Sequence, residues 1–403
     1  MTPFADKPLV VTPEPKGSVE VASREDLSRS RHWARAFAGK RKDHRYYEIV
    51  EQTLPQGFEY RYFAIKDENN EVQAVQPFFI HDQDLLEGVG TKTRRAVAFI
   101  RRIWPRFMRM RALMVGCVAG EGHLDDADDM PSEWQVRLLA SSLVPHARKL
   151  NAPLIVLKEF PAKYRMMLRC FLEQGFTLIP SLPMTKLNID YLSFDEYMKK
   201  ALNSATRTKL RRKFRAAAQA APIEMSVVTD IAPFLDDVYP LYLQVYERSN
   251  LHFEKLTKDY FCQLSRVMPD KVCYFVWRQN TRIVAFTLCM TEGEAIYAEY
   301  IGLDYSVALK LHLYHYAVRD MITWSIANGY KWLHSSGLNY DPKLHLRHLL
   351  DPVDLYVKHT SVIANALLKR VLPLMEPTRY DETLKKFANY RDLWAARDKT
   401  DRR

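Results

Sequence analysis

The stretch CYFVWRQNTRIVAFTLCMTEGEAIYAEYIG, residues 273–302, decides the fold class of this chain. Three runs rich in aromatic and β-branched residues are separated by two short polar turns, at 279–282 and 292–294. Runs of this kind, bounded by polar turns, are typical of β-strands. We therefore predict a β-meander whose last strand covers residues 295–302.

The same order of elements occurs in the first half of the chain, where two strand-like runs flank the polar turn DENNE at 67–71. Each meander is followed by a long amphipathic helix, a buried strand, a short helical stretch and a last strand. The helix, buried strand and last strand are predicted at 132–150, 154–159 and 186–189, and again at 309–327, 330–335 and 355–358. This order indicates mixed α/β sheets. The repetition favours a duplicated fold, with generic α/β patterning as the alternative.

The chain has 403 residues, which is enough for two domains. We predict an α/β (mixed α+β) protein with two tandem halves, each a mixed, mostly antiparallel sheet flanked by helices. The halves are placed at 23–190 and 191–370, after a loose lead over 1–22 and before a helical tail over 371–403. No apolar run approaches the ~20 residues that span a bilayer. We expect a cytoplasmic protein, with a peripheral position at the inner face of the membrane as the alternative.

The formal net charge of +11 suggests an anionic partner, such as the phosphates of a CoA-type donor, an RNA or an acidic membrane surface. A generally basic surface without such a partner is the alternative. Two segments contain no acidic residue: an insertion over 88–120 with eight basic residues, and residues 199–223. The second segment predicts a helix over 203–218 on which Arg207 and Arg211 share a face, beside Arg212. Such a face suits phosphates or a tRNA backbone, or is simply solvated.

The last strand of the second meander carries a carboxylate among apolar residues. Tyr297 and Glu299 alternate onto one face of this strand. A buried Glu is costly unless it is paired or used. Glu299 is therefore either a general base for an amine nucleophile or the partner of an arginine such as Arg319.

The polar loop SSGLNYDPKLHLRH, residues 335–348, follows a predicted buried strand, where ligands of α/β sheets usually bind. A capped loop with solvated charges is the alternative. His312 and His315 lie three residues apart on the preceding helix, but no third ligand is fixed by spacing, so we expect no metal. The loop residues that we expect to bind or orient substrate are Ser336, Asn339, Lys343, His345 and Arg347.

Three stretches carry a resemblance to a known family: SATRTKLRRKFRAA (204–217), WSIANGYKWLHSSG (324–337) and GLNYDPKLHLRHLLDPVDLYV (337–357). The order of elements resembles the GNAT superfamily, and the second half is similar to the FemAB-like tandem GNAT proteins of peptidoglycan-bridge type. The resemblance implies transfer of an acyl group from a CoA thioester to an amine, or of an amino acid from aminoacyl-tRNA. The usual phosphate loop of GNAT enzymes is missing after the strand 295–302.

We predict an N-acyltransferase that uses an acyl-CoA co-substrate, without a metal, and an amine acceptor that is a small molecule or a lipid or peptidoglycan precursor. Glu299 is the expected base, Tyr297 or Tyr340 the acid, and the polar loop would face Glu299 across a shared cleft. One alternative is an aminoacyl-tRNA-dependent transferase. The other is a non-catalytic peripheral membrane or scaffold protein, suggested by the basic and apolar residues 99–114.

Overall fold

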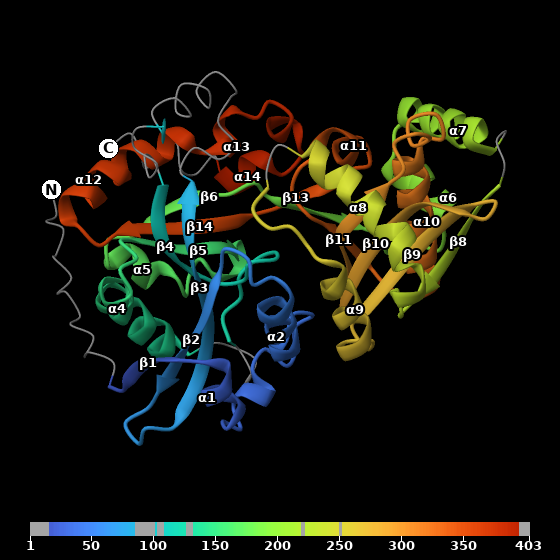
Figure 1. Ribbon diagram of the computed structural model, residues 1–403. Coiled ribbons are helices and arrows are strands. Elements are labelled where there is room, and N and C mark those ends of the chain that lie inside the picture. Colours follow the sequence, from blue (N-terminus) through green and yellow to red (C-terminus); the bar gives the residue numbers. More distant parts are fainter. Residues whose placement is uncertain are drawn as a thin grey trace, which may run out of the picture.

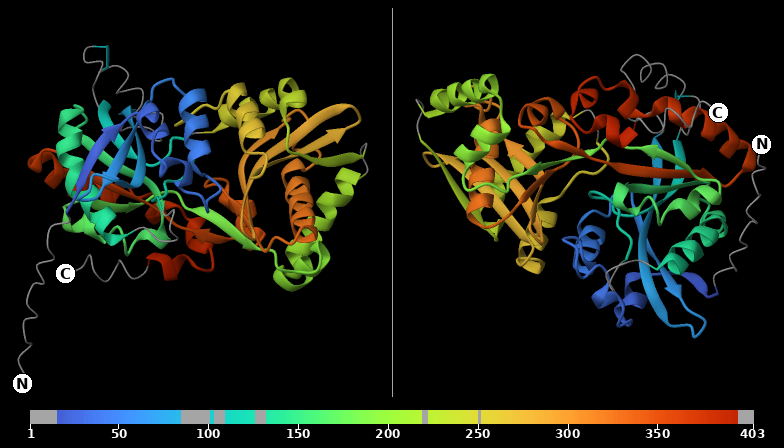
Figure 2. Two further views of the ribbon diagram at one scale, coloured as in Figure 1. Left: turned by 90° about the horizontal axis from the view of Figure 1, so that it is seen from below. Right: turned by 180° about the vertical axis from the view of Figure 1, so that it is seen from behind.

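The computed structural model describes residues 16–84, 101–102, 109–125, 132–218, 222–249 and 252–394. In this part of the chain the strands form two mixed seven-stranded sheets that lie side by side (Figures 1 and 2). The first sheet has the order β1 (Ser18–Ala22), β2 (Glu59–Lys66), β3 (Val72–Asp84), β4 (Arg109–Val115), β5 (Leu154–Pro161), β14 (Val353–His359) and β6 (Thr177–Pro180). The second has the order β8 (Ile223–Val228), β9 (Val272–Gln279), β10 (Arg282–Glu292), β11 (Ala295–Leu303), β12 (Trp332–Ser335), β7 (Met184–Asn188) and β13 (Leu349–Asp351).

The predicted mixed α/β fold with two GNAT-like halves is confirmed. Each half begins with four antiparallel strands, and the fourth is followed by a long helix and a strand that pairs with it in parallel. In the first half β4 pairs with β5 after α4 (Glu133–Lys149), and in the second β11 pairs with β12 after α10 (Leu313–Ala327). The second helix stops before Gly329, whose φ of +80° suits the end of a helix. The strand orders of the two sheets match position by position, as a duplication requires.

The last strands of the two halves are exchanged between the sheets. β7 follows the first half in sequence but pairs with β12 and β13, while β14 follows the second half and pairs with β5 and β6. The expectation that each last strand completes its own half is therefore wrong. Each exchanged strand occupies the equivalent position between two other strands of its sheet. Main-chain hydrogen bonding there does not depend on side-chain identity, so local patterning cannot tell the two sheets apart.

The ends of the chain also differ from expectation. Ser18–Ala22, placed in the loose lead, forms β1 and pairs with β2. Most of the predicted basic insertion lies outside the described residues, and two of its described arginines are paired with acids beyond it: Arg101 with Asp84, and Arg111 with Glu59. The acid-free stretch is thus partly neutralised by neighbouring strands.

Helices cover both sheets; in the C-terminal segment α12 (Val362–Val371) packs on the first sheet beside β14, and the residues after it pack against the second half (Figure 1). The helices before the exchanged strand β7 include α1 (Arg24–Ser28), α2 (His44–Thr53) and α5 (Arg169–Glu173). The second half adds α6 (Phe194–Ala201), α7 (Ser204–Ala218), α8 (Leu235–Arg248), α9 (Lys258–Val267) and α11 (Tyr340–His345). The tail contains α12, α13 (Pro377–Tyr380) and α14 (Tyr390–Trp394). Among the described helices, none combines the length and the apolar character that crossing a bilayer requires.

One hydrophobic cluster joins the two halves. Tyr46 of α2 packs edge-on against Tyr260 of α9, and the two hydroxyls lie 2.8 Å apart. Both side chains are buried. Burial of this much aromatic surface holds the halves together and brings the segment before α2 against β11.

Candidate functional site

Glu299 on β11 is ion-paired with the other half of the chain. Its Oε1 accepts a hydrogen bond from Nε of Arg41 at 2.7 Å, and its Oε2 lies 3.7 Å from Nζ of Lys42. The expected partner Arg319 instead pairs with its neighbour Asp320, at 2.7 Å. Of the two roles left open for Glu299, the structure therefore places it in an ion pair, with a partner that sequence proximity could not suggest.

The two cations belong to a buried charge cluster, composed of Arg41, Lys42, Glu121, His123 and Glu299. The side chains of Arg41 and Lys42 are 2% and 0% exposed. Arg41 and Lys42 both contact Glu121, the latter at 2.7 Å between Nζ and Oε2, and His123 Nε2 lies 3.0 Å from Glu121 Oε1. Two cations thus face two carboxylates, which is the condition for burying charge without a large penalty.

Electrostatics within this cluster keep the charges in place. Burial would raise the pKa of Glu121, but the positive charges of Arg41 and Lys42 hold that pKa well below its usual range. Burial lowers the pKa of His123, so the imidazole is neutral at neutral pH. The cluster is therefore a balanced pair of cations and anions that fastens the first half to β11.

Tyr297 lies on the same face of β11 as Glu299, as predicted, since both contact Arg41. The guanidinium carbon of Arg41 is 3.8 Å from the centre of the Tyr297 ring, and the other side of this tyrosine stacks on His334 at 4.3 Å between ring centres. His334 in turn faces Asp351, with 3.3 Å between Nδ1 and Oδ2. Burial raises the pKa of Tyr297, so its hydroxyl keeps its proton at neutral pH.

Two residues of the polar loop support the loop from inside. Nζ of the buried Lys343 donates hydrogen bonds to the backbone oxygens of Ser336 and Leu338, at 2.6 and 3.0 Å. Burial lowers the pKa of Lys343 to about 7. The Tyr340 hydroxyl donates to the backbone oxygen of Pro183 at 2.8 Å. These contacts hold a loop in which Leu338 and Asn339 adopt left-handed backbone angles, with φ of 70° and 46°.

The other polar side chains expected to bind substrate face solvent. Ser336, Asn339, His345 and Arg347 are exposed. His345 lies 3.8 Å from Asp341, which is also exposed. The loop therefore offers an outer polar surface and an inner framework, and only the outer surface is open to a ligand.

Basic side chains from three elements meet beside this loop and form a cationic cluster, composed of Lys209, Arg212, Lys213, His312, His315 and His345. Nζ of Lys213 on α7 is 2.9 Å from Nε2 of His315 on α10. Burial lowers the pKa of His315 to about 4, and Lys213, His312 and His345 add to this effect. Burial and the charges of Lys209 and Arg212 lower the pKa of Lys213. Asp341 is the acid that acts in the opposite direction on both groups.

The three basic residues singled out on α7 have different surroundings. Arg207 turns back and donates to the backbone oxygen of Leu202 at 2.6 Å, whereas Arg211 and Arg212 are exposed. The helix is capped by Asn203, whose side chain accepts from the Thr206 amide at 2.8 Å. The outer arginines of α7 are thus available to an anion, while Arg207 closes the first turn.

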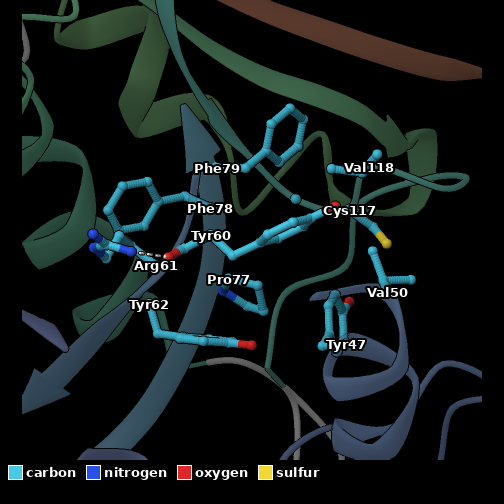
Figure 3. Close-up of a pocket in the computed structure, with 11 residues that line it drawn as sticks. Tyr47, Val50, Tyr60, Arg61, Tyr62, Pro77, Phe78, Phe79, Cys117 and Val118 are labelled. Atoms are coloured by element: carbon cyan, nitrogen blue, oxygen red, sulfur yellow. Dashed lines mark hydrogen bonds between the residues drawn. The ribbon is translucent and has the colours of Figure 1, made fainter. Parts of the chain in front are cut away.

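The polar loop begins beside Glu299 in the sheet. The parallel ladder between β11 and β12 ends at the pair Ala298 and Ser335, so Glu299 and Ser336 are the next residues of adjacent strands. The pocket in Figure 3 lies elsewhere, in the first half, and is lined by residues that include Tyr47 of α2 and Cys117. Its volume of about 10 Å³ is close to that of one water, so it does not suit a substrate.

In the described residues, no group of three or more His, Cys, Asp or Glu side chains is placed to hold a metal.

Sequence reasoning missed Arg41, Lys42 and Glu121. The only local signal was the run KRKD at 40–43, which also fits a solvated turn. The buried charge cluster also requires glycine at position 120, because a Cβ atom there would overlap the ammonium of Lys42 and the residue has a φ of +95°. This requirement appears only when the two halves are assembled.

The chain consists of two GNAT-like halves in tandem, with a polar loop and a cationic cluster beside the parallel strand pair β11 and β12. The FemAB-like family model, described as peptidoglycan biosynthesis/recognition, matches residues 163–345. Residues 163–345 are therefore similar to the FemAB-like family, which confirms the resemblance expected from the sequence.

Several solved structures match most of this chain at low sequence identity. A crystal structure of FemX is 13% identical and has a TM-score of 0.50, covering 82% of this chain and 94% of FemX. L-PGS from Bacillus licheniformis is 11% identical with a TM-score of 0.47, covering 83% and 98%. A tandem GNAT protein from the clavulanic acid biosynthesis pathway is 9% identical with a TM-score of 0.43, covering 78% and 86%. A search of curated proteins by sequence found no match.

Proposed function

We propose that this protein is an N-acyltransferase that moves an acyl group from an acyl-CoA-type donor to an amine. The observation that carries the proposal is the cationic cluster beside the first turn of α10. No side chain caps the start of α10, but the N–H groups of Leu313, His315 and Tyr316 already donate to backbone oxygens, so the side chains of the cluster would make the main contacts to an anion. Burial and the charges of Lys209 and Arg212 lower the pKa of Lys213, and a phosphate group beside these three residues would supply a negative charge.

The polar loop adjoins this cluster through Asp341 and His345. In our proposal the outer loop residues Ser336, Asn339, His345 and Arg347 orient the donor or the amine, and Lys343 keeps the loop in shape. Catalysis of this kind depends mainly on positioning and on polarising the carbonyl. Because Glu299 is paired with two cations, we assign to it the positioning of β11. Tyr297 then contributes a ring that packs between Arg41 and His334.

A direct test measures the binding and transfer of a panel of CoA thioesters with amine acceptors. We expect the double substitution Arg212→Ala and Lys213→Ala to weaken thioester binding by about tenfold or more, since each charge-assisted contact contributes roughly 1 kcal/mol or more. Arg215→Ala is a matched control, because Arg215 is an exposed arginine of the same helix outside the cluster. Thioesters that neither bind nor react with the intact protein would overturn the acyl-CoA donor.

A second candidate function is aminoacyl-tRNA-dependent transfer. It is favoured by the exposed basic residues of α7 that lie away from the loop, including Arg211 and Arg215, in a segment without acids. A polyanion would contact this surface through several phosphates, so its binding would weaken steeply as salt rises. A gel-shift assay with tRNA at low salt tests this candidate, and absence of any shift would exclude it.

A further inference from the structure

The helix α12 carries an apolar surface that faces solvent. Val362, Ile363, Leu367 and Leu374, the last in the 3₁₀ turn Leu372–Met375 after the helix, are 83%, 85%, 63% and 64% exposed. Isolated exposed apolar residues are common, but four large ones on successive turns of the same side of α12 and the 3₁₀ turn after it form a patch. A patch of this kind marks an interaction site.

This surface is held in a fixed orientation. Leu368 and Leu372 pack into the core, and the Asn365 side chain accepts from the His359 amide at 2.9 Å and donates to the Gly175 backbone oxygen at 3.1 Å. At 100° per residue, Ile363, Leu367 and Arg370 lie within one half of the helix circumference, opposite Leu368. The apolar surface is therefore presented outward by the fold and does not arise from fraying.

Basic residues accompany the apolar ones. Lys369 and Arg370 are exposed on α12, and Arg148 and Lys149 are exposed at the end of the neighbouring helix α4. Burial lowers the pKa of Lys358, and the positive charges of Lys369 and Arg148 lower it further, so these three groups lie close together. Residues 359–375 contain no acid.

We propose that α12 docks this protein on the surface of an anionic lipid bilayer. An amphipathic helix with aliphatic residues and basic residues on its outer side lies in the plane of the membrane, with the aliphatic side chains among the acyl chains and the basic ones at the headgroups. A second copy of this chain fits less well, because two such faces would bring Arg370 close to basic residues of the other copy, and residues 359–375 contain no acid to compensate. The proposal is independent of the donor that the cationic cluster binds.

The position of α12 leaves helix α7 of the candidate site free. Figures 1 and 2 show α12 and α7 at opposite ends of the molecule in all views. A membrane under α12 would therefore leave α7 open to solutes. This arrangement suits an enzyme that works near a bilayer on substrates that reach it from solution or from the membrane surface.

The experiment is flotation of the full chain with phosphatidylcholine vesicles and with vesicles that also contain phosphatidylglycerol. We expect binding to the anionic vesicles only. Ile363→Asp with Leu367→Asp, and separately Lys369→Glu with Arg370→Glu, should each reduce that binding by about tenfold or more. The matched controls are Leu192→Asp, at an apolar residue that is 91% exposed on the second half, and Lys199→Glu, and neither should change binding.

The substituted side chains are exposed, so unchanged thermal melting should accompany these effects. Failure of the intact chain to bind anionic vesicles, or equal binding by the α12 variants, would overturn the proposal. So would self-association of the intact chain without lipid that Leu367→Asp abolishes, because the apolar surface would then be an interface between two copies. Sedimentation of the lipid-free protein measures this last outcome.

Discussion

Arg41 of the first half and Glu299 of the second half form a buried ion pair, with 2.7 Å between Nε and Oε1. The two residues are 258 positions apart in the sequence. Their contact joins the segment before α2 to the strand that adjoins the polar loop. The pair therefore connects the assembly of the two halves to the geometry of the candidate site.

Glu299→Gln should destabilise the protein, because it leaves the buried Arg41 without one of its two carboxylates. Removing one partner of a buried ion pair typically costs about 3–5 kcal/mol, and the remaining contact with Glu121 favours the lower end. The free energy of unfolding in urea measures the effect. A variant with unchanged stability but with transfer reduced about a hundredfold would instead identify Glu299 as the general base.

Gly120→Ala should also destabilise the assembled halves. The new methyl group would overlap the Lys42 ammonium, and the φ of +95° disfavours any side chain. We expect a loss of about 2 kcal/mol or more. Gly293→Ala is the matched control, since Gly293 has a φ of +56° but open space around it, and the strain alone should cost about 1 kcal/mol. Equal losses at both positions would show that the contact with Lys42 contributes nothing.

Lys343 should make the stability depend on pH. Its pKa is about 7 in the folded protein and about 10.4 in an unfolded chain, so between these values the unfolded chain binds more protons at this residue. Its contribution to the free energy of unfolding therefore rises with pH over this range, by up to about 1.4 kcal/mol per pH unit, and is lost as pH falls towards 7. Urea unfolding at several pH values should show this slope in the intact protein and not in Lys343→Met. The exposed Lys199→Met is the control, and a slope that persists in Lys343→Met would contradict the assignment.

Tyr340→Phe should affect stability more than chemistry. The substitution removes the hydrogen bond to the buried Pro183 oxygen, which is worth about 1–2 kcal/mol. Thermal or urea unfolding together with kcat separates the two roles. If Tyr340 were the catalytic acid, kcat would fall by about a hundredfold or more while stability stayed nearly unchanged.

The sequence determined the kind of secondary structure and its order. Alternating apolar residues and polar turns identified the meander at 273–302, and the helix and buried strand after it repeated the arrangement of the first half. Local patterning also identified α7 and the polar loop as the residues with the most unusual charge and polarity. These features are readable because propensity, turn chemistry and charge depend on residues that are close in the chain.

The tertiary structure decided which strands belong to which sheet and which charges are paired. β7 and β14 are exchanged because the equivalent positions in the two sheets, each between two other strands, can accept either strand. Glu299 forms an ion pair with Arg41 and not with Arg319 because the packing of Tyr46 against Tyr260 brings the first half onto β11. Both outcomes depend on contacts between residues far apart in the sequence, and those contacts form only when the two halves bury their shared apolar surface.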